Sequence, residues 1–189
     1  MSNQEYWKKM WQKKGEIVTS DVQLLDGFED VKVPSNVLAR KIMNSLSIKH
    51  TDKVLEVGCG AGMIARHVSK KCQYYGIDIT ESLLTKHREL LNNNVIIAEA
   101  NDIPFKDNYF DKSFSYSVFH YFPDITYVWR VIEEMKRVTK GHIFIGDLPR
   151  TSKRKEHLLF TVSDFGRGII TEGYHCKERF NVLKWQEYY

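Results

Sequence analysis

The sequence predicts an α/β fold organised around a mostly parallel sheet. Its composition, with 28% charged and 13% aromatic residues in a chain of 189, has the balance of one globular domain. Residues 53–57 have the apolar, β-branched pattern of a buried strand, and a glycine-rich turn and a helical pattern follow them. Strand and helix patterns then alternate as far as residue 147, which is the order typical of parallel sheets.

The glycine-rich turn is the main candidate for a binding site. Gly58, Gly60 and Gly62 are spaced two apart, and a helical pattern starts at Met63. Because glycine has no Cβ, such a turn can adopt positive φ and let a ligand approach the backbone closely. Free N–H groups at the start of the following helix would point at that ligand. The turn is therefore predicted to bind a small polar molecule.

The segment Glu56-Val57-Gly58-Cys59-Gly60-Ala61-Gly62 resembles the first motif, E/D-x-G-x-G-x-G, of the class I (Rossmann-like) S-adenosylmethionine-dependent methyltransferases. The resemblance covers about residues 36–148 and is to the type found in ubiquinone-pathway and small-metabolite methyltransferases. It implies a doubly wound, mostly parallel Rossmann-like sheet with helices on both faces. It also implies S-adenosyl-L-methionine as cofactor and S-adenosyl-L-homocysteine as product. Residues 60–65 fit the G-x-G-x-x-G/A dinucleotide fingerprint as well, but the acid two residues before the first glycine favours the methyltransferase.

The other elements are predicted in chain order. An amphipathic helix at residues 2–14 carries an aromatic stripe with Trp7 and Trp11, and is interpreted either as docked on the core or as a lid over the ligand. A helix with Ser35 as its N-cap precedes the first strand. Glu133 and Arg137 have the i,i+4 spacing of an ion pair. Strands are predicted at 74–79, 95–98, within 107–118 and at 142–147, and helices at 81–91 and 125–138.

The resemblance assigns cofactor-binding roles. Asp78, at the end of the second strand, would hold the ribose hydroxyls, because a carboxylate can accept hydrogen bonds from two vicinal hydroxyls. Asp102 and Ile103 lie in a stretch that resembles the family's D-x-P-F segment. There the acid accepts from the adenine amino group and the next backbone N–H reaches the ring. The alternative for Asp102 is a turn before Pro104. The predicted cofactor-binding residues are Glu56, Gly58, Cys59, Gly60, Gly62, Asp78, Ile79, Asp102, Ile103 and Ser117.

Two residues are candidates for catalysis. His120 and Tyr121 follow the fourth strand, and ligands of open α/β sheets bind beyond the carboxyl ends of the strands. Histidine titrates near neutral pH, so His120 is the candidate base if the acceptor must lose a proton. A structural role, packed against Phe119 and Tyr121, is the equal alternative for His120. Tyr121 is expected either to hydrogen-bond the acceptor or to form a wall of the pocket.

The carboxyl-terminal part departs from the family pattern. A complete domain of this family ends with two strands that form an antiparallel edge. The sequence after Asp147 does not show a pattern for both of these strands. A last helix is predicted instead at 177–188. The chain is therefore expected either to be truncated or to complete its edge by other means, such as a second subunit in a homodimer. Three segments are expected: an N-terminal helix or lid at 1–35, a cofactor-binding methyltransferase core at 36–148, and a C-terminal segment at 149–189.

The remaining bulk properties narrow the class of protein. Three cysteines without C-x-x-C spacing predict neither a disulfide framework nor a zinc site, and no metal is predicted. The first residues lack the pattern of a signal peptide, and no apolar run is long enough to cross a bilayer, so a soluble, cytoplasmic protein is expected. The net charge of +4 permits an anionic substrate but makes a nucleic-acid partner unlikely.

The predicted function is transfer of a methyl group to an O or N atom of a small molecule. The aromatic N-terminal helix and the basic run at 150–155 favour a small, anionic metabolite or glycan precursor as acceptor. The alternatives are an RNA methyltransferase, an NAD-dependent oxidoreductase and a non-catalytic protein that binds the cofactor. An oxidoreductase would need a second mononucleotide-binding half, for which 189 residues leave little room.

Overall fold

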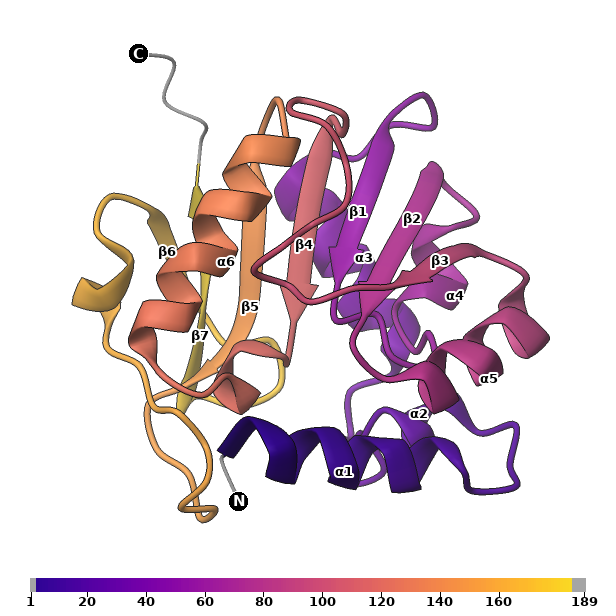
Figure 1. The fold of residues 1–189 in the computed structure, drawn as a ribbon. Helices are drawn as coiled ribbons and strands as arrows, with labels where there is room; N and C mark the ends of the chain where they lie inside the picture. The colour runs from indigo at the N-terminus through magenta and orange to yellow at the C-terminus, as the bar shows by residue number, and fades with distance from the viewer. Residues whose placement is uncertain (1–2, 185–189) are drawn as a thin grey trace.

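The computed structural model describes residues 3–184. One sheet of seven strands runs through it in the order β3-β2-β1-β4-β5-β7-β6 (Figure 1). No helix in the described part of the chain is long and apolar enough to cross a membrane. The strands are β1 (Lys53–Val57), β2 (Gln73–Asp78), β3 (Asn94–Ile97), β4 (Lys112–Tyr116), β5 (Ile143–Pro149), β6 (Ile169–Glu172) and β7 (Arg179–Lys184). The helices are α1 (Asn3–Gly15), α2 (Val22–Leu25), α3 (Ser35–Leu46), α4 (Ala65–Val68), α5 (Glu81–Leu91) and α6 (Ile125–Val138), with 3-10 turns η1 (Phe119–Tyr121) and η2 (Val162–Phe165).

The topology of the sheet decides where a ligand can bind. Strands β1 to β5 pair in parallel, and only β7 runs antiparallel to its two neighbours. The chain order reverses between β1 and β4, because β2 and β3 lie on one side of β1 and all later strands lie on the other. Ligands of doubly wound sheets bind outside the carboxyl ends of the strands at such a switch point. The α/β, doubly wound, mostly parallel prediction is confirmed.

Two hydrophobic layers cover the two faces of the sheet. One layer contains the buried side chains of α2, α3, α4 and α5, including Leu38, Ile42 and Leu84. The other contains the apolar stripe of α6 together with Phe165 of η2. Figure 1 shows α6 in front of the sheet and α3 behind it. Both faces are covered, and β5 is accordingly buried along its whole length.

The prediction that the edge strands are missing is wrong. Strand β7 pairs with β5 and β6 pairs with β7, so the antiparallel edge is built within residues 169–184. The predicted helix at 177–188 is also wrong over 179–184, which are strand, while 185–189 lie outside the described residues. The sequence pattern does not reveal these two strands, because β6 is four residues long and mostly exposed, and β7 carries the buried polar residues Asn181 and Lys184. Its partner β5, not its own pattern, makes this segment a strand.

The predicted ion pair on α6 is wrong in its partner. Arg137 pairs with Glu134 at 2.7 Å and with Asp107 at 2.8 Å. The guanidinium also donates to the carbonyl oxygens of Ile103 and Phe105. Arg137 therefore links the loop after β3 to α6. These contacts with the loop arise because the two segments lie close together in the fold, and the spacing of residues along the helix does not predict them.

Helix α1 lies across the carboxyl ends of the strands (Figure 1). Trp7 is only 3% exposed, and its indole N–H donates to the carbonyl oxygen of Glu156 at 3.3 Å. At the other end of the helix, the Ser82 hydroxyl of α5 donates to the carbonyl oxygen of Gln12 at 2.8 Å. The helix is thus docked on the core and covers the carboxyl edge of the sheet. Its action as a lid stays a prediction.

The antiparallel edge should belong to the cooperative core. Phe180 of β7 is fully buried and contacts Phe165 edge to face at 5.8 Å. Truncation of a buried phenylalanine costs about 3–5 kcal/mol, so Phe180→Ala should lower the free energy of unfolding by that amount in urea. Ile169→Ala on β6, where the side chain is 54% exposed, is the control and should cost about 0.5 kcal/mol or less. Equal effects of the two variants would contradict a core role for the edge.

Candidate functional site: a cleft at the carboxyl edge of the sheet

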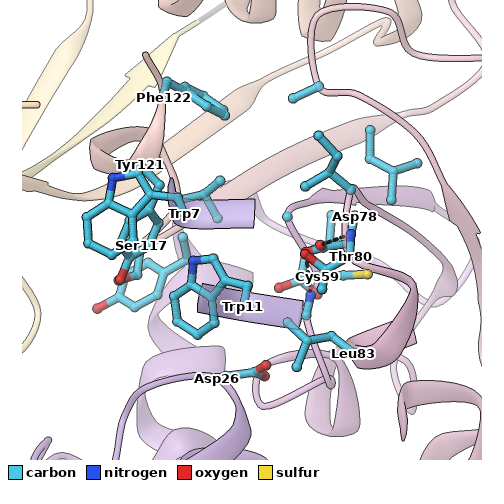
Figure 2. A pocket seen from close by; sticks show the side chains of 18 of the residues that line it. Trp7, Trp11, Asp26, Cys59, Asp78, Thr80, Leu83, Ser117, Tyr121 and Phe122 are labelled. Atoms are coloured by element: carbon cyan, nitrogen blue, oxygen red, sulfur yellow. Dashed lines mark hydrogen bonds between the residues drawn. The ribbon is translucent and has the colours of Figure 1, made fainter. Parts of the chain in front are cut away.

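A cleft opens between α1 and the carboxyl ends of β1, β2 and β4. It holds about 1020 Å³ of empty space, including the part that is open to solvent. In Figure 2, Trp7, Trp11 and Tyr121 group on one side of the cleft, while Asp78 and Thr80 lie on the other. Of the predicted site residues, those that line it are Glu56, Gly58, Cys59, Gly60, Asp78, Ile79, Ser117 and Tyr121.

The glycine turn forms the floor of the cleft as predicted. Gly58, Gly60 and Gly62 all have positive φ. At Gly60 a Cβ would lie 2.3 Å from a carboxylate oxygen of Asp26, so no side chain fits there. Gly62 does not line the cleft and packs instead against Leu91 of α5. The turn leads into α4, which has only four helical residues.

Asp26 is the site residue that the sequence analysis missed. Its carboxylate accepts hydrogen bonds from the backbone N–H groups of Ala61 at 2.6 Å and Met63 at 2.8 Å. Asp26 directly follows α2 and lies 35 residues before Ala61, so no local sequence pattern connects it with the turn. Burial, with the charge of Asp78 adding, raises the pKa of Asp26 to about 7, although the backbone hydrogen bonds oppose the shift. An acid therefore already fills the anion-binding position of the turn.

Asp78 ends β2 and faces the cleft. Its Oδ2 accepts from the N–H of Gly60 at 3.0 Å, and its Oδ1 accepts from the N–H of Thr80 at 2.9 Å (Figure 2). Burial raises the pKa of Asp78, and these backbone hydrogen bonds oppose the rise. Each carboxylate oxygen keeps a further lone pair. Asp78 is therefore fixed in place with acceptor capacity directed at a ligand.

Glu56 and Cys59 lie deeper, under the turn. Glu56 is 4% exposed and accepts a hydrogen bond of 2.6 Å from the Tyr74 hydroxyl. Burial and the charges of Asp26 and Asp78 raise the pKa of Glu56 well above its usual value. Burial likewise raises the pKa of the Cys59 thiol, so this sulfur is an unreactive, small side chain. Three acids, Asp26, Glu56 and Asp78, therefore converge on one end of the cleft.

The structure does not bring Asp102 and Ile103 to the cleft. Asp102 is exposed and is absent from the cleft lining. The N–H of Ile103 donates to Glu134 at 2.8 Å, so it is not free to reach an adenine ring as predicted. Glu99 is likewise exposed and does not itself line the cleft, but it accepts hydrogen bonds from Tyr127 at 3.3 Å and from Gln4 at 3.4 Å, and both of these residues line the cleft. Glu99 and Asp102 lie three residues apart before the same proline, Pro104, so the sequence pattern alone does not distinguish between these two acids.

The two candidate catalytic residues differ in position. Tyr121 lines the cleft, with its ring 4.6 Å from Trp7 and 5.2 Å from Trp11. His120 is 1% exposed and does not line the cleft. Burial, with Arg179 and His157 adding, lowers the pKa of His120 well below its usual value. His120 therefore has the surroundings of a structural residue, and its role as a base stays a prediction.

The ends of β4 and β5 are conformationally unusual. Ser117 directly follows β4 and Asp147 lies within β5 near its carboxyl end, and both have positive φ, 62° and 66°, without being glycine. Ser117 lines the cleft, and its N–H donates to the carbonyl oxygen of Gly146 at 3.1 Å. Such conformations cost about 1–3 kcal/mol each and gather at functional sites. The carboxyl ends of β4 and β5 are thus the strained part of the site.

The fold and the cleft together define an α/β protein that binds a nucleoside-type cofactor at the carboxyl edge of its sheet. A glycine turn after β1 and a ligand-facing carboxylate at the end of β2 meet at the switch point of the sheet. Comparison with known proteins then gives the family. A family model described as "Methyltransferase domain" matches residues 55–145.

Relatives and solved structures agree with the family model. The ubiquinone/menaquinone biosynthesis C-methyltransferase UbiE of Chromobacterium violaceum is 32% identical over 122 residues, which is 59% of this chain and 49% of that protein. Phosphoethanolamine N-methyltransferase 1 of Haemonchus contortus, solved with phosphoethanolamine and S-adenosylhomocysteine, superposes with a TM-score of 0.76. That match covers 97% of this chain and 48% of the other at 13% identity. A SAM-dependent methyltransferase from Aquifex aeolicus gives 0.66 at 24% identity and covers 95% and 98%.

Residues 55–145 match the methyltransferase family model, and the chain is similar to class I S-adenosylmethionine-dependent methyltransferases, whose cofactor is S-adenosylmethionine. The likenesses to solved structures, all below 25% identity, show the fold. The chain spans about half the length of the UbiE proteins that it matches.

The raised pKa of Asp26 predicts a pH-dependent stability. A carboxyl with a pKa of about 7 in the folded chain, against about 3.9 in the unfolded chain, binds its proton more tightly when folded. This group therefore stabilises the folded protein as the pH falls from about 7 towards 4. Asp26→Asn cannot titrate, so the Tm of the wild type minus that of the variant should be larger at pH 5.5 than at pH 8. Calorimetric unfolding at both pH values measures it, and a constant difference would contradict the shift.

Proposed function

We propose that this protein transfers the methyl group of S-adenosylmethionine to an O or N atom of a small-molecule acceptor. The observation that carries the proposal is the convergence of Asp26, Glu56 and Asp78 at one end of the cleft. S-adenosylmethionine carries a sulfonium and an ammonium group, and an opposite charge favours the ionised form of a carboxyl. Three acids with raised pKa values would thus be matched by a cationic ligand.

The same observation argues against a dinucleotide. In dinucleotide-binding folds the pyrophosphate sits on the N–H groups that follow the glycine turn. Here the Asp26 carboxylate accepts from two of those N–H groups, those of Ala61 and Met63. A pyrophosphate would have to displace a carboxylate and lie beside Asp78 and Glu56. Like charges at such short range oppose this.

The residues divide the cleft into two ends. On the cofactor end, Asp78 is placed to hold the ribose hydroxyls, and Ile79 and Leu83 offer apolar surface to the adenosine. On the other end, Ser117 and Tyr121 face an enclosure formed with Trp7 and Trp11 of α1. Methyl transfer from a sulfonium is an in-line displacement, so the protein has mainly to align the acceptor atom about 3 Å from the methyl carbon. The tryptophans exclude water and orient the acceptor there.

The class of acceptor is a narrower proposal. The walls of the acceptor end are mostly aromatic, from Trp7, Trp11, Phe28, Tyr116 and Tyr121. These rings suit a small planar molecule or an amine, since an ammonium group binds over aromatic faces. The relatives support both, because the UbiE proteins are named for ubiquinone and menaquinone biosynthesis and the Haemonchus enzyme was solved with phosphoethanolamine. An anionic metabolite remains within the proposal.

Calorimetric titration with S-adenosylhomocysteine and, separately, with NADH tests the class of cofactor. S-adenosylhomocysteine alone should bind, and Asp78→Ala should weaken its binding by about tenfold or more, because a hydrogen bond to a charged group is worth about 1.5–3 kcal/mol. Binding of NADH alone would overturn the proposal.

A matched pair of variants tests the adenine end of the cleft. Glu99→Gln should weaken binding of S-adenosylhomocysteine by about three- to tenfold, since Glu99 is hydrogen-bonded to two cleft residues and, in our proposal, accepts a hydrogen bond from the adenine amino group. Asp102→Asn, an exposed acid three residues away, is the control and should bind as the wild type does. The reverse order of effects would restore Asp102 to the site.

Release of S-adenosylhomocysteine measures turnover with three acceptor probes, namely catechol, 4-hydroxybenzoate and phosphoethanolamine. Turnover with either phenol supports a planar hydroxyl acceptor, and turnover with phosphoethanolamine supports an amine. Trp7→Ala should abolish turnover while S-adenosylhomocysteine still binds, because Trp7 forms the acceptor end of the cleft. If the variant and the wild type turn over equally, the acceptor does not bind under α1.

A further inference from the structure

A series of three polar side chains leads from the acceptor end of the cleft into the protein. Tyr116, the last residue of β4, lines the cleft and is 5% exposed. Its hydroxyl lies 3.2 Å from Nδ1 of His175, in the loop between β6 and β7. Nε2 of the same ring lies 3.4 Å from Oδ1 of Asp147 on β5. Three elements thus contribute a hydroxyl, an imidazole and a carboxylate in series.

Asp147 is held in position by strand β7. Arg179 donates to its Oδ2 at 2.7 Å and to its carbonyl oxygen at 3.0 Å. The side chain of Asn181 accepts from the Asp147 N–H at 3.0 Å, which fixes the left-handed backbone of this residue. The other carboxylate oxygen, Oδ1, is buried and lies 3.4 Å from Nε2 of His175, a contact longer than an ordinary hydrogen bond. Burial raises the pKa of Asp147, and the nearby charges of Arg179 and His175 and a hydrogen bond from the Ser117 side chain oppose the rise.

We propose that Tyr116, His175 and Asp147 form a proton relay that accepts the proton of the methyl acceptor. The proposal rests on the proposed methyl transfer to O or N. Tyr116 is the catalytic residue, because it faces the cleft, and His175 and Asp147 act through it. The Nε2–H of His175 would donate to Oδ1 of Asp147, and this 3.4 Å contact would shorten when His175 becomes an imidazolium, because catalytic hydrogen bonds tighten in the reacting complex.

The step balances in atoms and charge. The lone pair of the acceptor oxygen or nitrogen forms the bond to the methyl carbon, and the carbon–sulfur bond breaks with its electron pair left on sulfur. The acceptor's proton passes to the Tyr116 oxygen as the Tyr116 proton passes to Nδ1 of His175. The positive charge of the sulfonium is thereby replaced by that of the imidazolium. Asp147 accepts from Nε2–H and stabilises that charge, as a carboxylate does in hydroxyl–imidazole–carboxylate triads.

The surroundings fit a relay better than a resting phenolate. Burial and the charge of Asp147 raise the pKa of Tyr116, so its hydroxyl stays protonated. It therefore gives its own proton to His175 only as it takes up the proton of the acceptor. The groups that face His175 are Tyr116 from β4, Asp147 from β5 and the ring of Phe28 before α3, with Arg179 of β7 beyond Asp147. The relay thus has one carboxylate beside the imidazole and the arginine on the far side of that carboxylate.

Nitrogen-15 NMR of the histidine rings tests the relay without an acceptor. The probe is the protein bound to S-adenosylhomocysteine. The neutral ring of His175 should carry its proton on Nε2, and Tyr116→Phe should move the Nδ1 signal downfield, because Nδ1 then loses a donor. Tyr174→Phe is the control: Tyr174 stacks on Tyr116 at 6.3 Å, but its hydroxyl bonds Ser45, so His175 should not respond. A proton on Nδ1, or no response to Tyr116→Phe, would overturn the relay.

The pH profile of turnover gives an independent test, with whichever of the three acceptor probes is methylated. His175→Gln should lower kcat by about 100-fold or more at little change in KM and remove the acid limb of the profile. His50→Gln, at an exposed histidine, should leave both unchanged. An acid limb that persists in His175→Gln would overturn the relay even if turnover falls. Failure of S-adenosylhomocysteine to bind the wild type would instead overturn the proposed function.

Discussion

The site depends on how the backbone N–H groups of the glycine turn are satisfied. Each such donor costs free energy if it is buried without an acceptor. Asp26 takes those of Ala61 and Met63, and Asp78 takes those of Gly60 and Thr80. Two carboxylates from separate parts of the chain therefore hold the turn in its observed conformation. The same two carboxylates give the cleft the negative charge that suits a cationic cofactor.

This arrangement also joins the N-terminal segment to the core. Asp26 lies in the segment that connects α1 to α3, and its bonds to the turn bring α2 against the floor of the cleft. Trp7 and Ser82 anchor the two ends of α1 over the strands. Helix α1, which covers the cleft, is therefore linked through the segment with Asp26 to the glycine turn that forms the floor. A ligand that changes the charge on Asp26 acts on both α1 and the turn.

The antiparallel edge serves the opposite end of the cleft. Strand β7 supplies Arg179 and Asn181, which fix Asp147 in its left-handed conformation, and the loop before β7 supplies His175. Without this edge, the carboxyl end of β5 would carry a buried carboxylate with no cation beside it, which is costly. The same structural feature therefore completes the sheet and holds the proposed relay in position.

The sequence by itself determined the parallel core. Strong local periodicity fixed α5 and α6 at their observed bounds, and the positive φ values of the glycine turn follow from residues that have no Cβ. Tertiary structure alone decided the contact of Asp26 with the glycine turn, the hydrogen bonds of Glu99 to two residues of the cleft, and the strand β7. Each of these rests on a contact between segments far apart in the chain, such as the 35 residues from Asp26 to Ala61. Local pattern cannot show such pairings, because the partner that satisfies a polar group is chosen only when the chain has folded.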